Sequence, residues 1–191
     1  PVGAIIDMAS KHKMAIFAAH TNLDKVTDGL NDILARIIGL NNLKALGEST
    51  SESMLAGRQQ GLGRIGDLVR ETKLSSFALE IKKKIGLNYI KVAGEPDLLI
   101  KKAALCTGSG SSLINNFFAS GAQVYISGDF RYHDARAAEA ANLGIIDISH
   151  FASEHLVVEI FARRLREIIS KTGIDVKVEA CKSEIDPFVL L

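Results

Sequence analysis

Two histidines in this chain are each followed, four residues later, by a carboxylate: His20 by Asp24, and His150 by Glu154. Each histidine follows a short apolar run of the kind that forms a buried strand, so each would lie where a strand leaves the sheet. Imidazole and carboxylate groups without thiolates suit Zn, Mn, Fe, Ni or Co, and such sets are typical of catalytic rather than closed structural sites. The two pairs therefore predict one metal site with four ligands, His20, Asp24, His150 and Glu154.

One such pair alone would be weak support for a metal site. A histidine at a strand end is more often hydrogen-bonded to the backbone than bound to a metal. Two matched pairs at equivalent positions of the same strand and helix pattern favour the metal.

A third polar cluster, Asp129, Arg131, His133 and Asp134, follows a predicted strand that ends near Gly128. His133 could act as a general acid or base, and Arg131 could bind an anionic group. We therefore predict His133 and Asp129 as catalytic residues and Arg131 as a substrate ligand. The alternative is that Asp129 and Asp134 only cap the helix that follows.

A glycine and serine loop at residues 107–112 lies between another predicted strand and helix. Free backbone N–H groups in such a loop, together with the helix dipole, can hold a phosphate or a carboxylate. Ser109, Gly110 and Ser111 are therefore predicted substrate-binding residues. The loop lacks the Gly-Lys-Ser/Thr ending of a Walker motif, and it could also be only a tight connection.

The composition is that of an ordinary globular protein: 191 residues, 47% hydrophobic and 24% charged, with a formal net charge of +1. No overall field attracts nucleic acid or anionic lipid, so binding to either is not supported. The sequence contains no long apolar span and no signal peptide pattern, and its two cysteines lack disulfide-like spacing. We expect a cytoplasmic protein with reduced thiols and no membrane partner.

Hydrophobic periodicity divides the chain into helices and strands that alternate regularly from residue 100 onward. Gly39 and Gly86 end two of the helices, and residues 40–63 are interpreted as a surface loop. Helices are predicted at 2–11, 30–38, 74–85, 112–119, 133–142 and 153–171, and strands at 14–19, 64–70, 89–93, 100–106, 123–126, 145–148 and 174–180.

This alternation predicts an α/β fold with a mainly parallel or mixed sheet flanked by helices. Functional sites of such sheets lie at the carboxyl ends of the strands, where the four predicted ligands would meet. We expect a single α/β unit over residues 1–191, which could be divided into an N-terminal lobe at 1–63 and a C-terminal lobe at 64–191.

With these elements in place, the chain resembles the Nif-three-like family of dinuclear-metal proteins, also known as GTP cyclohydrolase I type-two homologues. The resemblance covers essentially the whole chain in order, and its motifs are specific in combination. They are residues 18–24 with the following 29–32, residues 61–66, residues 108–112, residues 128–134, residues 150–154 and the closing Asp186-Pro187-Phe188.

The resemblance implies the Nif-three-like fold, a pair of divalent metal ions (Zn, Mn, Fe, Ni or Co) and a toroidal homo-hexamer. It assigns His20, Asp24, His150 and Glu154 as metal ligands and adds a His-His pair upstream of the region that matches His20. No His-His pair occurs in this sequence, which begins with Pro1. We therefore expect an N-terminal segment with that pair to be missing.

Three functions follow as hypotheses. The first is a dinuclear-metal-dependent hydrolase, similar to GTP cyclohydrolase type two, acting on a nucleotide or another phosphate-containing small molecule. The second is a non-catalytic, hexameric metal-binding or regulatory protein. The third is an ordinary α/β domain that binds an anion at residues 107–112.

Overall fold

The computed structural model describes residues 2–47 and 61–189. Its elements are α1 (Val2–Lys11), α2 (Thr21–Lys25), α3 (Leu30–Ile38), β1 (Leu40–Leu46), β2 (Gly63–Lys73), α5 (Leu74–Ile85), β3 (Lys91–Ala93), β4 (Leu99–Ser109), the 3-10 turn η1 (Ser111–Leu113), α6 (Ile114–Ala119), β5 (Val124–Gly128), α7 (Tyr132–Ala140), β6 (Gly144–Asp147), α8 (His150–His155) and α9 (Val157–Ile169). Among the described helices, none has the length and apolar character needed to cross a membrane.

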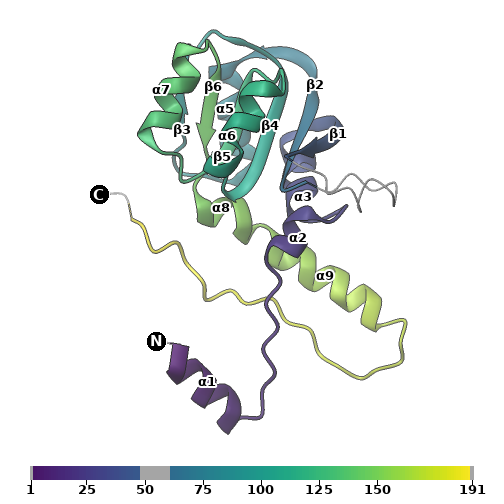
Figure 1. Ribbon diagram of the computed structural model, residues 1–191. Helices are drawn as coiled ribbons and strands as arrows, with labels where there is room; N and C mark the ends of the chain where they lie inside the picture. The colour runs from purple at the N-terminus through teal and green to yellow at the C-terminus, as the bar shows by residue number, and fades with distance from the viewer. Residues whose placement is uncertain (1, 48–60, 190–191) are drawn as a thin grey trace.

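A six-stranded sheet in the order β1-β2-β4-β5-β6-β3 organises the molecule (Figure 1). Strands β4, β5 and β6 are parallel, whereas β1, β2 and β3 pair antiparallel with their neighbours. The predicted mixed α/β sheet is therefore confirmed. Its parallel centre places the carboxyl ends of three strands at one edge.

Helices cover both faces of the sheet (Figure 1). On one face α3 and α5 pack against alternate strand residues such as Leu105 and Ile126, and on the other α6 and α7 pack against Cys106 and Tyr125. Strands that are buried on both faces are largely apolar, which explains the apolar runs that predicted β4, β5 and β6.

Two predicted helices match the structure closely because their periodicity and end signals agree. In α3 one apolar face is buried, and Gly39 ends the helix in the left-handed conformation at φ 96°. In α5 the buried residues Phe77 and Ile81 share a face, and Gly86 ends the helix at φ 78°. Glycine adopts such angles without the Cβ strain that other residues carry.

Two predicted strands are wrong. Residues 14–19 and 174–180 form neither strand nor helix, and most of their apolar side chains are exposed, Phe17 at 85%. An apolar run becomes a strand only when a neighbouring strand and a covering layer bury it, and among the described residues none does so here. His20 therefore does not end a strand.

The predicted surface loop at 40–63 is also partly wrong. Residues 40–46 form β1, an edge strand paired with β2 from Leu40 opposite Leu68 to Leu46 opposite Gly63. The sequence pattern did not indicate this strand, because it contains polar residues such as Asn41 and Asn42. An edge strand tolerates them, since part of it is exposed to water. Residues 48–60 of the predicted loop lie outside the described residues.

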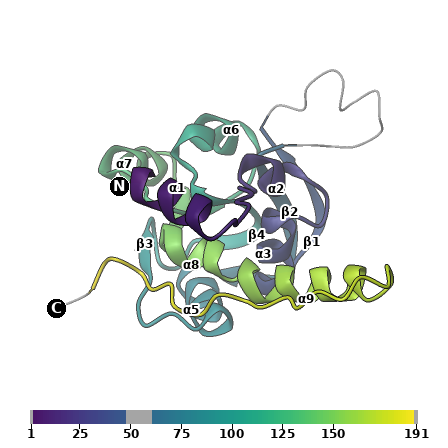
Figure 2. The same ribbon diagram turned by 90° about the horizontal axis from the view of Figure 1, so that it is seen from below.

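The segments outside the sheet are less buried. In α1 only Ala9 is buried, and in α9 only Ala162. Figure 2 shows α9 extending away from the sheet, whereas α8 lies below it and packs against β4 and β5. The lobe boundary proposed above, between residues 63 and 64, falls within β2, which begins at Gly63 and pairs with β1 in the same sheet.

Candidate functional site

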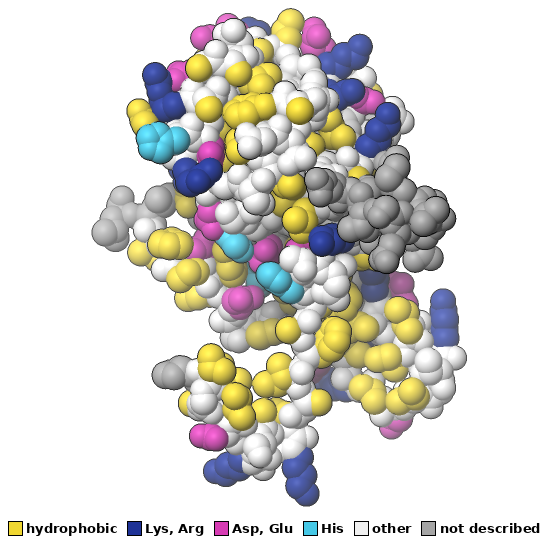
Figure 3. Space-filling model, in the orientation of Figure 1, with side chains coloured by type: hydrophobic (Ala, Val, Ile, Leu, Met, Phe, Trp, Pro, Cys, Tyr) yellow, Lys and Arg dark blue, Asp and Glu magenta, His cyan; other side chains and the backbone are white. Residues whose placement is uncertain are grey.

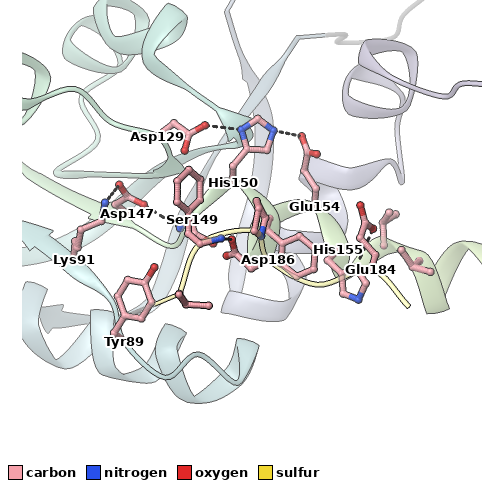
Figure 4. A pocket seen from close by; sticks show the side chains of 16 residues that line it. Tyr89, Lys91, Asp129, Asp147, Ser149, His150, Glu154, His155, Glu184 and Asp186 are labelled. Atoms are coloured by element: carbon pink, nitrogen blue, oxygen red, sulfur yellow. Dashed lines mark hydrogen bonds and ion pairs between the residues drawn. The ribbon is translucent and has the colours of Figure 1, made fainter. Parts of the chain in front are cut away.

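The carboxyl ends of β5 and β6 bring Asp129 and His150 together. The two strands are parallel, with Ser127 opposite Asp147, so the residues that follow them emerge side by side. Nδ1 of His150 lies 2.7 Å from Oδ2 of Asp129, and its Nε2 lies 3.3 Å from Oε1 of Glu154 (Figure 4). His150 and Glu154 are four residues apart on α8, which places them on the same helix face.

An unusual backbone conformation sets the start of α8. Ser149, the N-cap residue, has φ 66° and ψ 152°, a region that only glycine occupies readily. Its N–H donates to Oδ1 of the buried Asp147, and its Oγ accepts from the N–H of Ala152. These contacts hold the strained residue, and they fix where His150 begins the helix.

Gly108, near the end of β4, forms the backbone wall of the site. It has φ 66°, and a Cβ added there would lie 2.5 Å from Oε1 of Glu154 and 3.3 Å from Nε2 of His150. Its N–H donates to Oγ of Ser153, 2.7 Å away, which ties β4 to α8. Only glycine leaves the space that the two functional side chains border.

The segment that contains Asp24 lies beside the end of β4, although it is far from β4 in the sequence. Asn31, fully buried in α3, donates through Nδ2 to the carbonyl of Asp24 (3.2 Å) and accepts through Oδ1 from the N–H of Thr107 (2.8 Å). The buried Arg64 donates to the carbonyls of Lys25 and Val26. These hydrogen bonds hold the Asp24 segment beside the end of β4.

The negative charge of Glu154 acts on Asp24. Burial raises the pKa of Asp24, the negative charge of Glu154 raises it further, and the charge of His20 and the Thr107 hydroxyl lower it. Burial lowers the pKa of His150, but the hydrogen bond to Asp129 and the charge of Glu154 outweigh it, so that pKa is raised overall.

These four residues fit a cation by their chemistry. The charge of Glu154 raises the pKa of Asp24, and the His150 ring lies beside Glu154. Gly108 approaches both Glu154 and His150 closely, and His20 lies four residues before Asp24 in the sequence. Figure 3 shows acidic and histidine side chains gathered on one face below the sheet. Among the residues that the structure describes, however, no three such side chains have the spacing of a formed metal site.

The other predicted catalytic residue, His133, lies elsewhere. It is exposed near the start of α7, with its ring 5.7 Å from that of Tyr132, and it does not line the pocket beside His150. Asp129, by contrast, contacts His150 directly. The structure thus brings one of the two predicted catalytic residues to the candidate ligands.

Arg131 and Asp134 bind one another. The Arg131 guanidinium donates to both carboxylate oxygens of Asp134 at 3.0 and 2.9 Å, and the Arg131 N–H donates to the same carboxylate. The guanidinium lowers the pKa of Asp134. Asp134 therefore caps α7, which was one of the alternatives for it. The Arg131 guanidinium, which was predicted to bind an anionic substrate, is paired with Asp134 instead.

The glycine and serine loop uses its polar groups internally. Ser111 donates through Oγ to Asp134, the carbonyl of Gly110 accepts from the Tyr125 hydroxyl, and Ser109 pairs with Gly128 in the sheet. No contact among the described residues brings these three to His150. Their role in substrate binding stays a prediction.

A pocket of about 810 Å³ opens beside the candidate ligands. Asp129, His150, Glu154 and Tyr89 line it (Figure 4). Phe151 lines it as well. Residues 184 and 186–189 of the C-terminal segment also border it.

Asn31 and Arg64 shape the site but were not predicted to act in it. Asn31 could have been noticed, because a polar residue within the apolar stripe of α3 must find buried partners. Arg64 carries no such signal, since its partners come from other segments. Thr107 and Gly108 belong to the loop at 107–112 that was predicted to bind an anion, and the structure places Gly108 beside Glu154 and His150.

The comparisons with known proteins agree with this architecture. A family model described as Duf34/NIF3 (NGG1p interacting factor 3) matches residues 1–187. A relative named GTP cyclohydrolase 1 type 2 homolog, from Streptomyces coelicolor, is 31% identical over 97% of this chain and 65% of its own length. The protein NIF3 homolog of Schizosaccharomyces pombe is 30% identical over 92% of this chain and 64% of its own.

Solved structures show the same fold. A hypothetical protein of Staphylococcus aureus superposes with a TM-score of 0.87 at 27% identity, over all of this chain and 73% of the other. Reduced HcgD from Methanocaldococcus jannaschii superposes with a TM-score of 0.67 at 29% identity, over 90% of this chain and 62% of the other. The chain spans about two thirds of the length of the curated relatives described above. The resemblance seen in the motifs is thereby confirmed, and the chain belongs to the Duf34/NIF3 family.

Proposed function

We propose that this chain binds divalent metal ions through His20, Asp24, His150 and Glu154 and acts as a metal-dependent hydrolase. The observation that carries the proposal is the arrangement of His150 between Asp129 and Glu154, with the backbone of Gly108 close to both His150 and Glu154. A histidine that donates from one nitrogen to a carboxylate presents the other to a cation.

The residues of the chain have separate roles in this proposal. A divalent cation, when bound, polarises the bond under attack and lowers the pKa of a bound water. Asp129 holds the Nδ1 proton of His150, so that the Nε2 lone pair faces the site. Asp24 and Glu154 supply negative charge that a proton or a cation must offset. His133 remains the proposed proton carrier only if it reaches the substrate from α7.

The proposed substrate is a nucleotide or another phosphate-containing small molecule. Several relatives are named GTP cyclohydrolase 1 type 2 homolog, and GTP is therefore the first nucleotide to test. The pocket has room for such a ligand, and Tyr89 and Phe151 offer aromatic surface beside the ion-binding residues. Lys91 lies at the same pocket but is paired with Asp147 at 2.9 Å.

The test combines metal analysis with a turnover assay. The purified chain is loaded separately with Zn²⁺, Mn²⁺, Fe²⁺, Ni²⁺ and Co²⁺, its metal content is counted, and hydrolysis of GTP and a panel of phosphate esters is followed. We expect metal-dependent turnover that disappears in Glu154→Ala and persists in Glu95→Ala, a change at an exposed turn. A chain that takes up no metal, or turnover unaffected by Glu154→Ala, would refute the proposal.

A second candidate is a non-catalytic metal-binding or regulatory protein. The position of His133 favours it, because the predicted proton carrier does not line the pocket. Stoichiometric metal uptake without turnover across the panel would select this function.

A homo-hexamer is proposed for either function. Large apolar side chains of α1, such as Ile5 and Ile6, are exposed at 59% and 60% in the single chain, and burying them would favour assembly. Light scattering during size-exclusion chromatography gives the mass that decides this.

A further inference from the structure

Thr107 carries a buried hydroxyl group at the end of β4, close to the candidate ligands. The residue is buried at 6% exposure, and its Oγ1 forms no hydrogen bond of standard geometry with any described residue. Buried hydroxyls are nearly always paired, because an unpaired one costs about 1–3 kcal/mol. The proposed function assigns this group no role.

The surroundings of Thr107 connect it to two candidate ligands. Its N–H donates to Oδ1 of Asn31, whose Nδ2 donates to the backbone carbonyl of Asp24. One carboxamide therefore fixes the backbones of Thr107 and Asp24 relative to each other. The residue after Thr107 is Gly108, which borders Glu154 and His150.

The carboxylate of Asp24 is the acceptor that lies beside this hydroxyl. It is an anion, and a hydroxyl group that donates to an anion forms a stronger hydrogen bond than one that donates to a neutral acceptor. A carboxylate that binds a cation through one oxygen must also be held at the other, or it rotates away.

We propose that Thr107 is a positioning residue, whose hydroxyl donates to the Asp24 carboxylate and orients it toward the bound cation. The proposal rests on the proposed metal binding and adds a residue to it. A structural alternative exists, in which Thr107 only fills space at the end of β4. The Thr107→Val variant separates the two roles, because valine fills the same space as threonine but has no hydroxyl to donate.

The experiment compares Thr107→Val, which keeps the shape and loses the hydroxyl, with Thr107→Ser, which keeps the hydroxyl. The probe is Co²⁺ alone, titrated into each variant while its visible absorption reports the coordination geometry. Thr172→Val is the control, since the exposed Thr172 hydroxyl bonds only locally: it donates to the carbonyl of Ile169 and accepts from the N–H of Ile174. Thermal melting of each metal-free variant is measured in parallel.

We expect Thr107→Val to weaken Co²⁺ binding about tenfold and to change the Co²⁺ spectrum. Removing a residue that hydrogen-bonds to a metal ligand typically has an effect of this size. Thr107→Ser and Thr172→Val should bind as the unchanged chain does. Thermal melting shows whether each metal-free variant is folded, so that weaker Co²⁺ binding by a folded Thr107→Val chain reports the lost donor.

Equal Co²⁺ affinity and spectrum in Thr107→Val and the unchanged chain would overturn this inference and leave the proposed function standing. Weak binding by Thr107→Ser as well as Thr107→Val would also overturn it, since the hydroxyl would then not be the cause. An unchanged chain that binds no Co²⁺ would instead refute the proposed function, and this inference with it.

Discussion

Nδ1 of His150 lies 2.7 Å from Oδ2 of Asp129, although 21 residues separate the two in sequence. Their meeting follows from the parallel pairing of β5 and β6, since each residue follows the carboxyl end of its strand. With the Nδ1 proton donated to Asp129, Nε2 is the nitrogen left for a cation. The contact therefore decides the tautomer as well as the direction of the ring.

Replacing Asp129 tests this contact. In Asp129→Ala the imidazole loses its acceptor, and we expect metal affinity to fall about 10–100-fold, as it does when such a partner is removed elsewhere. The His150 pKa should fall as well, because Asp129 raises it. Metal titration and NMR of the histidine ring protons measure both. Asp175→Ala, an exposed change outside the site, should alter neither.

The pH dependence follows from the raised pKa of His150. Only the neutral imidazole binds a cation, so metal affinity should fall with decreasing pH, and the fall should begin above the ordinary histidine pKa of 6.5. In the metal-free chain the sign is opposite: the stabilisation from protonated His150 is complete below pH 6.5 and is lost as pH rises through the folded-state pKa. Affinity that is constant between pH 6 and 8 would contradict this assignment.

Asp24→Asn should separate stability from metal binding. Burial and the charge of Glu154 disfavour the ionised carboxylate, so at neutral pH the metal-free variant should be more stable than the unchanged chain. Metal affinity should fall by more than the roughly 10–100-fold that follows the loss of a residue hydrogen-bonded to a ligand, because here a ligand itself is lost. Urea unfolding without metal and metal titration measure the two effects. A variant that is both less stable and unchanged in affinity would exclude Asp24 from the site.

Gly108→Ala and Gly121→Ala form a matched pair. Both glycines have left-handed φ angles, 66° and 75°, so each substitution should cost about 1–2 kcal/mol of stability through backbone strain. A Cβ at Gly108 would also meet Oε1 of Glu154 at 2.5 Å, whereas at Gly121 it would meet no atom within 4 Å. Metal affinity should therefore fall in Gly108→Ala alone. Equal losses in both variants would show that Gly108 does not border the site.

The buried ion pair of Arg64 with Asp32 should matter far more than an exposed one. Arg64→Met leaves Asp32 buried and unpaired and removes the donors to Lys25 and Val26, so we expect a loss of about 3–5 kcal/mol. Arg36→Ala breaks an exposed pair with Asp28 and should cost less than about 1 kcal/mol. Chemical unfolding compares the two. Similar losses would mean that Arg64 does not hold the Asp24 segment.

The candidate site was partly predictable. The sequence predicted that His150 and Glu154 bind together, but it began the helix at residue 153. In the structure α8 begins at His150, so both residues lie on one helix face. The matching argument for His20 relied on a strand at 14–19 that does not exist. Asp24 nevertheless approaches Glu154, because Asn31 and Arg64 fix its segment and not because a strand delivers it.

By itself the sequence determined the elements whose local signals agree: α3 and α5 with their terminal glycines, and the three apolar strands of the parallel centre. Their periodicity and end residues are properties of adjacent positions, which a single sequence displays. Only the tertiary structure decided that β1 is an edge strand, that two apolar runs stay exposed, and that Gly108 must lack a side chain beside Glu154. Each of these depends on what another, distant segment places against the residue, and no local pattern contains that contact.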